Sequence, residues 1–333
     1  MVAGTGMTDQ QTAGIRSAPQ GSTKRQHKRT LGAVMPLCVR GSYDVDDLNR
    51  AEILFRTLQA FAEPGLIDPF LVVTPPDEVD IVAEHYARWK SLNIEVLSEE
   101  ELVPELANYR ELRGWRRQQI VKLAAARRIE RDFFITFDAD VLCLKPLSYD
   151  DLIIDGRALL QYEERAHHPQ WWKSSARSLG MSPATRDPDM GMHVTPAVLS
   201  TALCHNLAAE LSGSPHGTWV DVLGWLHRPR HPSNWTIERF RRRRWTEYSL
   251  YYMCALKRGE LDRYHVRAGT DEHPQLLSVG CKHEFETWDT AASFSPYGPS
   301  FFCLVGSKSR VEPQAVWEHI KPFLPGVELQ NAG

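Results

Sequence analysis

Two aspartates stand one residue apart at the end of a mostly apolar run. The run FFITF covers residues 133–137, Asp138 and Asp140 follow it, and apolar residues resume at once. Residues i and i+2 of a strand point to the same side, so the two carboxylates converge unless the chain turns between them. Burying both without partners would cost several kcal/mol for each ion. A shared divalent cation removes this repulsion, and ligands that are all oxygen suit Mg²⁺ or Mn²⁺.

A metal ion held in this way can bridge two phosphates and stabilise a departing diphosphate. The alternative is structural, with both aspartates capping the turn after the strand. D-x-D alone is a weak motif. Its position after an apolar strand, within alternating strands and helices, strengthens the metal interpretation.

The first half of the chain alternates between the two kinds of element. We expect strands at 31–39, 69–76, 94–99 and 133–137, and helices at 45–62, 78–92 and 113–129. Asp46 or Asp47 is expected to cap the first helix. The alternation predicts an α/β fold with a parallel sheet covered by helices on both faces. Ligands of such sheets bind beyond the carboxyl ends of the strands, where Asp138 and Asp140 stand.

The second half is less regular and rich in Trp, His and Pro. The segment RRRR at 241–244 reads as a loop that enters a helix at 246–256, with Thr246 as its N-cap. A late strand and turn are expected within 299–309. A terminal helix is expected at 312–324, with Pro313 near its start.

Composition excludes several classes of protein. The chain has 333 residues, a formal net charge of −3, 42% hydrophobic and 24% charged residues, which is ordinary for a globular enzyme and gives no sign of nucleic-acid binding. The six cysteines lack C-x-x-C spacing, which argues against structural zinc and against a disulfide scaffold. Free thiols in a reducing compartment are expected, and a cytoplasmic location with them.

Membrane contact is expected to be weak at most. No apolar run approaches the ~20 residues that cross a bilayer. Residues 1–29 hold almost no large apolar side chains, so we expect a disordered tail. The basic cluster KRQHKR at 24–29 could touch an anionic membrane surface, the alternative being a solvated tail.

Three segments together resemble the metal-dependent GT-A glycosyltransferases: RGWRRQQIVKLAAA at 113–126, FFITFDADVLCLKPL at 133–147 and WTEYSLYY at 245–252. More narrowly, the chain resembles the uncharacterised bacterial DUF6492 type over roughly residues 31–325. The resemblance implies a GT-A-like, mixed and mainly parallel sheet flanked by helices. It also implies a nucleotide-sugar-binding half at 30–150 and an acceptor-binding half at 151–333 of the same domain.

The resemblance implies chemistry as well. The donor is expected to be a UDP- or GDP-linked sugar, the acceptor a glycan, a glycolipid precursor or a small molecule, and the cofactor Mn²⁺ or Mg²⁺. Asp138 and Asp140 are expected to hold the metal and the donor, with one carboxylate reaching the ribose. GT-A enzymes often add a later histidine as a ligand, and we favour His283 over His265. A surface or hydrogen-bonded histidine is the alternative for both.

Further donor contacts are expected around the aspartates. Arg117 or Lys122 could reach the diphosphate, and Gln118, on the same helix face as Lys122, could bond a hydroxyl of the ribose or sugar. A solvated helix face is the alternative for these three. Pro36, within the first strand, and Lys308, in the segment VGSKS, are the remaining candidates.

Glu247 is the candidate catalytic carboxylate. It would act as the base for the attacking hydroxyl in an inverting reaction, or stabilise the cationic sugar in a retaining one. Near the start of a helix it could instead serve as a cap or dipole partner. Asp189 and His193 are expected to contact the transferred sugar, because GT-A enzymes often have a pocket-lining strand at that point of the chain.

Two other functions are weighed against sugar transfer. Haloacid-dehalogenase-type phosphatases also place D-x-D after an apolar strand. Their motif continues D-x-D-x-[TV], whereas Asp140 is followed by Val141 and Leu142, and their strand opens the domain, whereas this one is the fourth. The other alternative is a non-catalytic protein that binds sugars or nucleotides.

Overall fold

A mixed five-stranded sheet lies at the centre of the protein. The computed structural model describes residues 29–41, 44–182, 190–212, 217–227, 235–277 and 285–325. The strand order is β10-β4-β1-β2-β3, with β1 (Leu31–Pro36), β2 (Ile67–Thr74), β3 (Ile94–Ser98), β4 (Phe133–Thr136) and β10 (Ala197–Ser200). Every pairing is parallel except that of β10 with β4 at the edge. The predicted mixed, mainly parallel α/β class is confirmed.

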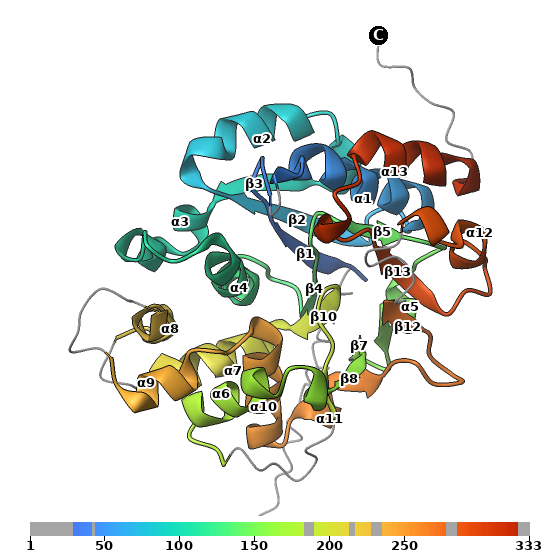
Figure 1. Cartoon of the computed structure of the whole chain (residues 1–333). Coiled ribbons are helices and arrows are strands. Elements are labelled where there is room, and N and C mark those ends of the chain that lie inside the picture. Colours follow the sequence, from blue (N-terminus) through green and yellow to red (C-terminus); the bar gives the residue numbers. More distant parts are fainter. Residues whose placement is uncertain are drawn as a thin grey trace, which may run out of the picture.

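The helices of the first half follow the predicted alternation (Figure 1). They are α1 (Asp47–Phe61), α2 (Val79–Tyr86), the short α3 (Glu99–Leu102) and α4 (Gly114–Ala124). The helix expected at 78–92 ends at Tyr86, and a separate 3₁₀ turn covers Lys90–Leu92. The cap of α1 is Asp46, which accepts a hydrogen bond from the Asn49 backbone N–H at 3.0 Å. Asp47 is therefore not the cap.

Two apolar layers cover the sheet. Val34, Leu71 and Phe134 face one layer, which includes the buried residues of α4 and α10 (Glu247–Arg258). Their chain neighbours Ala33, Phe70 and Ile135 face the other layer, together with α1 and α2. This alternation is the two-residue period of a strand. A sheet buried on both faces requires strands that are largely apolar, which explains the apolar runs that made the strands predictable.

The second half packs largely beneath the sheet in the view of Figure 1. Its helices besides α10 are α6 (Pro169–Ser178), α7 (Thr201–Ser212), α8 (Trp219–His227), α9 (Ile237–Arg242) and α11 (Leu261–Tyr264). The short α5 (Tyr149–Leu152) follows β4 in the middle of the chain, and α12 (Thr290–Ser293) and α13 (Pro313–Ile320) lie near its C-terminal end. Because α10 contacts α4, α6 and α7, it joins the two halves.

The remaining strands of the described ranges form three small sheets. One has the order β12-β13-β5, with β5 (Val141–Cys143), β12 (Gln275–Leu277) and β13 (Ser300–Leu304). Another has the order β11-β7-β6, with β6 (Ile153–Ile154), β7 (Arg157–Leu160) and β11 (His265–Arg267). The last pairs β8 (Tyr162–Glu164) with β9 (Met190–Met192).

Several local predictions can be compared with the structure. Thr246 caps α10 as expected, accepting from the Ser249 backbone N–H at 3.1 Å. Pro313 begins α13 as expected. The loop predicted at 241–244 is wrong in its first half, because Arg241 and Arg242 form the last turn of α9. A charge run does not by itself break a helix, since arginine has a high helix propensity.

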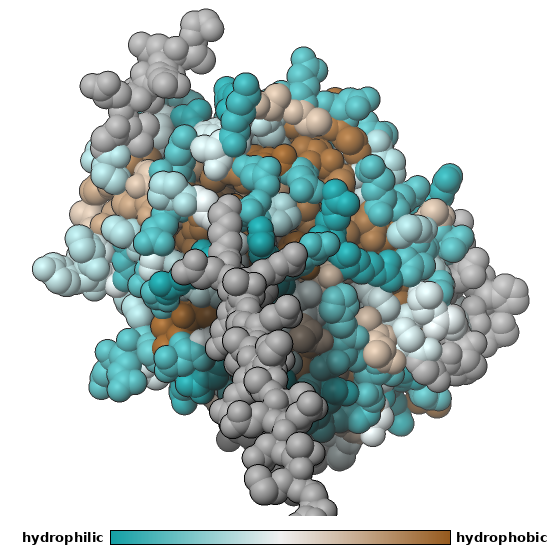
Figure 2. All heavy atoms as spheres, turned by 180° about the vertical axis from the view of Figure 1, so that it is seen from behind, coloured by the Kyte–Doolittle hydropathy of each residue, from teal (hydrophilic) through white to brown (hydrophobic). Residues whose placement is uncertain are grey.

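The structure also bears on the predictions about membrane-spanning segments and cysteines. No helix among the described ranges is long and apolar enough to cross a membrane. Figure 2 shows a face of the molecule on which hydrophilic residues cover most of the coloured surface, with hydrophobic residues visible between them. The cysteines in the described ranges are all free. Cys281 and residues 1–28 of the expected tail lie outside those ranges.

His265 is buried in the core of the second half. Its Nδ1–H donates to the Ala158 carbonyl at 3.2 Å, and its Nε2 accepts from the Tyr251 hydroxyl at 2.7 Å. Tyr251 in turn accepts from the Ser200 backbone N–H at 2.7 Å. Burial lowers the pKa of His265 to about 4, partly offset by the bond to Ala158. His265 is therefore a buried, hydrogen-bonded histidine, which was the alternative to its role as a metal ligand.

The depressed pKa of His265 predicts acid sensitivity. The unfolded chain takes up this proton below its ordinary pKa of about 6.5, whereas the folded protein resists it down to about 4, so stability falls as the pH falls through that interval. Relative to His265→Gln, the wild type should lose up to about 1.4 kcal/mol per pH unit in that window. Urea unfolding at pH 6.5, 5.5 and 4.5 measures this difference, and parallel pH profiles for the two proteins would contradict it.

Candidate functional site

The chain turns sharply where β4 ends. The Phe137 backbone N–H still donates to the Val34 carbonyl of β1 at 2.9 Å, and the Val141 N–H then donates back to the Asp138 carbonyl at 3.3 Å. This turn gives the two aspartates different surroundings. The side chain of Asp138 is 45% exposed, whereas Asp140 is mostly enclosed, with its Oδ2 accepting from the Ser307 N–H at 3.2 Å.

The surroundings of Asp140 disfavour the charged form of its carboxyl group. Burial raises the pKa of its carboxyl to about 7, the Asp138 and Asp47 carboxylates raise it as well, and the Arg50 guanidinium lowers it. Burial also raises the pKa of Asp47 to about 6, where Arg50 acts against it and Asp138 adds to it. Burial and the neighbouring carboxylates thus disfavour the charged forms of Asp140 and Asp47.

Asp47 brings the start of α1 to this site. Its Oδ1 lies 4.0 Å from Nη1 of Arg50 and has no hydrogen-bond partner within the described ranges. A Cβ on Gly41 would lie 1.4 Å from Asp47 Oδ2, so any larger residue at position 41 would require the Asp47 carboxylate to move. Arg50 is 2% exposed and bonds the Val311 carbonyl at 3.2 Å. One buried cation therefore interacts with both Asp47 and Asp140.

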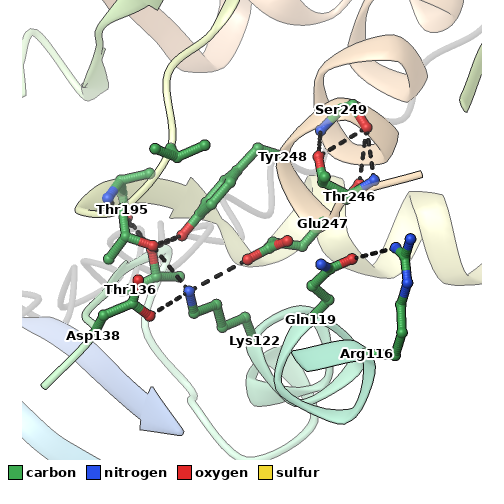
Figure 3. A network of polar contacts seen from close by, with 12 residues as sticks. Arg116, Gln119, Lys122, Thr136, Asp138, Thr195, Thr246, Glu247, Tyr248 and Ser249 are labelled. Carbon is green, nitrogen blue, oxygen red and sulfur yellow. Dashed lines mark hydrogen bonds and ion pairs between the residues drawn. The ribbon is translucent and has the colours of Figure 1, made fainter. Parts of the chain in front are cut away.

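Lys122 links the site to the second half of the chain (Figure 3). From α4 its Nζ lies 2.7 Å from Asp138 Oδ1 and 3.3 Å from Glu247 Oε1, at the start of α10. It also donates to Thr195 Oγ1 at 2.9 Å. The Tyr248 hydroxyl then joins Thr195 at 2.7 Å to Thr136 of β4 at 2.8 Å.

The protonation of this network follows from its burial and charges. Burial acts to lower the pKa of Lys122, but Asp138, Tyr248 and Glu247 hold it well above its ordinary value. Burial raises the pKa of Glu247, and the Lys122 ammonium partly offsets this. The side chains of Lys122 and Glu247 are 5% and 6% exposed. Glu247 is thus a buried acid whose main counter-charge is Lys122.

The structure brings four of the predicted residues into one region. Asp138 and Asp140 follow β4, and Lys122 contacts both Asp138 and Glu247. Lys308 lies nearby, because it follows Ser307, whose backbone N–H donates to Asp140. The side chain of Lys308 is exposed. Pro36 is the last residue of β1, the strand next to β4.

Other predicted donor contacts point differently. The guanidinium of Arg117 forms an ion pair with Glu99 and donates to the carbonyls of Leu106 and Tyr109 at 3.4 and 3.3 Å. Gln118 is half-buried on α4. His193 follows β9, with its Nδ1 2.9 Å from the Val194 carbonyl.

Sequence reasoning missed several members of the site. Thr136 and Thr195 lie far apart in the chain and are joined only through Tyr248. Arg116 bonds the Gln119 side chain at 3.0 Å and also the Trp245 carbonyl, so it ties α4 to the start of α10. The motif that contains Arg116 marks this helix as part of the site, but the predicted diphosphate contact is its neighbour Arg117.

The donor set allows a test of the expected metal. No group of three or more His, Cys, Asp or Glu side chains that could hold a metal occurs within the described ranges. Mg²⁺ often needs only one or two carboxylates, because waters and substrate phosphates supply its other ligands. Asp138, whose side chain is 45% exposed, and the half-buried Asp140, which lies near the carboxylates of Asp138 and Asp47, fit such a partial site. His283 and Asp189 lie outside the described residues.

The described cavities do not mark this site. A hollow of about 740 Å³ lies at the opposite end of β4, where Asp132, Phe133 and Thr201 line it. Next to Asp140 the cavity is only about 10 Å³, between Arg50 and Val305. Chemistry requires particular groups rather than a large volume, and Asp138 provides an accessible carboxylate.

Comparisons with known proteins place the chain in a group without assigned activity. The model of a family described as "Family of unknown function (DUF6492)" matches residues 28–328. No curated protein matches the chain.

Solved structures show only distant likeness. Mouse xyloside xylosyltransferase 1 in its apo form has 11% identity and a TM-score of 0.47, covering 83% of this chain and 97% of that one. The galactosyltransferase LgtC with donor and acceptor sugar analogs has 10% identity and a TM-score of 0.41, covering 89% and 97%. Glucosyl-3-phosphoglycerate synthase from Mycobacterium tuberculosis, with Mn²⁺, UDP and glucosyl-3-phosphoglycerate, has 14% identity and a TM-score of 0.32, covering 72% and 70%. TM-scores this low do not establish an activity.

Proposed function

The chain belongs to the DUF6492 family, and from this premise we propose that it is a metal-dependent glycosyltransferase of GT-A type whose donor is a nucleoside-diphosphate sugar. The observation that carries the proposal is the pairing of two kinds of carboxylate. Asp138 and Asp140 stand at the carboxyl end of β4, and Lys122 joins Asp138 directly to the buried Glu247. Sugar transfer needs both a site for a diphosphate and a carboxylate near the sugar.

Asp138 and Asp140 would hold Mn²⁺ or Mg²⁺ together with the donor. When bound, the ion neutralises the negative charge that develops on the departing diphosphate. Ser307 N–H keeps the Asp140 carboxylate in place at 3.2 Å. Lys308, the next residue, would contact the diphosphate from the same turn. Pro36, Arg117 and Gln118 remain proposed donor contacts, and His283 remains a proposed further metal ligand.

Glu247 would act at the sugar or at the acceptor. In an inverting reaction its carboxylate takes the acceptor hydroxyl proton as the acceptor oxygen bonds to the anomeric carbon, and the glycosidic C–O electrons leave with the diphosphate. In a retaining reaction the same carboxylate stabilises the cationic sugar. Burial raises the pKa of Glu247, which makes it a stronger base than an exposed glutamate. Asp189 and His193 would contact the sugar.

Lys122 would position both carboxylates. Its Nζ contacts Asp138 and Glu247 at 2.7 and 3.3 Å, which fixes the diphosphate end of the site relative to the sugar end. The acceptor would be a glycan, a glycolipid precursor or a small molecule bound by the second half. The free thiols of the described ranges support the proposal of a reducing, cytoplasmic setting.

Nucleotide-sugar turnover tests the proposal. The wild type should slowly release nucleoside diphosphate from at least one UDP- or GDP-sugar in the presence of Mn²⁺, and Glu247→Gln should lower this rate by roughly 10²–10⁴-fold. Glu238→Gln is the matched control, because Glu238 is 77% exposed on α9. We expect the control to retain wild-type turnover.

The rival functions give different products. A phosphatase would release inorganic phosphate from simple phosphate esters. A non-catalytic binding protein would gain thermal stability with the nucleotide and release nothing. Either result would reject the transferase.

A further inference from the structure

Large apolar side chains are exposed among arginines around α9. Trp235 is 60% exposed, Ile237 73% and Phe240 54%. Scattered exposed apolar residues are ordinary on proteins, but three between positions 235 and 240 form a local concentration. The arginine run at 241–244 follows directly, with Arg241 and Arg244 exposed.

A hollow of about 470 Å³ lies where α9 meets the end of α6. It is lined by Arg177, Met181, Ile237, Glu238, Arg241 and Arg242. Three guanidinium groups here oppose one carboxylate, and Glu238 is already engaged by Arg242 at 3.3 Å. The hollow therefore combines a net positive charge with the apolar side chains of Met181 and Ile237.

Aromatic rings and guanidinium groups also lie together in a second cavity along α9. A smaller cavity of about 50 Å³ is lined by residues that include Trp235, Phe240, Arg239 and Arg243. The Arg243 guanidinium lies 4.4 Å from the centre of the Phe240 ring. This mixture of aromatic, aliphatic and cationic side chains is typical of protein surfaces that lie in a membrane interface.

We propose that the α9 surface, defined as Trp235, Ile237 and Phe240 with Arg177, Arg241, Arg242, Arg243 and Arg244, docks on an anionic phospholipid bilayer. Trp235, Ile237 and Phe240 enter the boundary between head groups and acyl chains, and the arginines bind lipid phosphates. Charge complementarity carries the choice of partner, because this surface is locally basic on a chain whose formal net charge is −3.

The aliphatic member of the surface favours a bilayer over a nucleic acid. Ile237 is the most exposed of the three apolar residues, and it has no means of binding a phosphate backbone or reading a base edge. In a bilayer interface its burial is favourable. The proposal does not depend on sugar transfer, since docking requires neither a donor nor Glu247.

The place of this surface in the chain gives docking a consequence. α9 ends at Arg242, Thr246 caps α10, and Glu247 is the first residue of that helix. Arg116 spans the same junction through its bond to the Trp245 carbonyl. The α9 surface is therefore separated by only a few residues of sequence from the carboxylate proposed to act at the sugar or the acceptor.

Vesicle sedimentation tests the docking with the full chain and no nucleotide. Vesicles of phosphatidylcholine with 30% phosphatidylglycerol, taken as a roughly physiological anionic content, should bind the protein, and pure phosphatidylcholine should bind it much less. Arg241→Gln and Arg244→Gln should each lower the partition coefficient roughly fivefold. Trp235→Ser and Phe240→Ser should each lower it roughly tenfold. High salt should weaken the binding.

Matched controls lie elsewhere on the surface. Tyr297 is 97% exposed and the Arg263 side chain 70% exposed, so Tyr297→Ser and Arg263→Gln should bind as the wild type does. The basic cluster at 24–29 is common to all variants and controls, so differences between them report on the substituted side chains.

Four results would overturn the proposal. They are no binding to anionic vesicles, equal binding to neutral ones, loss of binding in the controls to the same degree, and variants of the α9 surface that bind normally. Self-association that Phe240→Ser abolishes would instead assign the surface to a second copy of this chain. Binding to duplex DNA with an equal dependence on Arg241 would assign it to nucleic acid.

Discussion

Replacing Lys122 by methionine is expected to lower the free energy of unfolding by about 3–5 kcal/mol. The substitution leaves the buried Glu247 without its ammonium partner at 3.3 Å and Thr195 without its donor at 2.9 Å. Methionine has a similar length and fills the same space, so the loss reports on charge rather than on volume. Chemical denaturation at pH 7 measures it.

A double variant separates charge from packing. In Lys122→Met/Glu247→Gln the remaining buried charge is removed, so most of the lost stability should return. Turnover should not return, because both groups of the proposed site are then absent. Equal destabilisation in the single and double variants would show that Lys122 does not neutralise Glu247, and the proposed link between the two halves would fail.

Replacing Asp140 by asparagine is expected to weaken the Mn²⁺-dependent binding of UDP or GDP by at least about 100-fold. Asparagine keeps the size of the side chain and removes the negative charge that a cation requires. Titration calorimetry with and without Mn²⁺ measures the effect.

Stability shows whether the binding loss is local. Burial and the neighbouring carboxylates raise the pKa of Asp140 to about 7, so the folded state favours its protonated form. Above that pH its ionisation destabilises the fold, and Asp140→Asn should be no less stable than the wild type at pH 8. Asp132→Asn, exposed just before the same strand, is the control and should bind normally. Full binding by Asp140→Asn would remove Asp140 from the site.

The main sheet and the position of Asp138 and Asp140 were predictable from local sequence. A strand that is buried on both faces must be largely apolar, as the stretches at 31–36 and 133–136 are. The starts of helices were also predictable where a capping residue precedes the helix, as Thr246 does. These features depend on neighbours within a few residues.

The contacts of the site were not predictable in this way. Lys122 meets Asp138, Glu247 and Thr195 only because α4, β4 and α10 pack together, and no local pattern specifies that packing. Asp46 and Asp47 are adjacent acids, and only the direction of α1 decides that one caps the helix while the other joins the acidic site. The same limit applies to Arg116 and Arg117, which point to different partners from one helix.

The position of the cation tests the central claim most directly. A crystal soaked with Mn²⁺ and UDP or GDP, with diffraction data collected at the manganese absorption edge, would locate the ion by its anomalous signal. The proposed function predicts one manganese peak in contact with the carboxylates of Asp138 and Asp140, with diphosphate oxygens completing its ligands. An ordered nucleotide bound away from Asp140, or a manganese ion elsewhere in the protein, would contradict it.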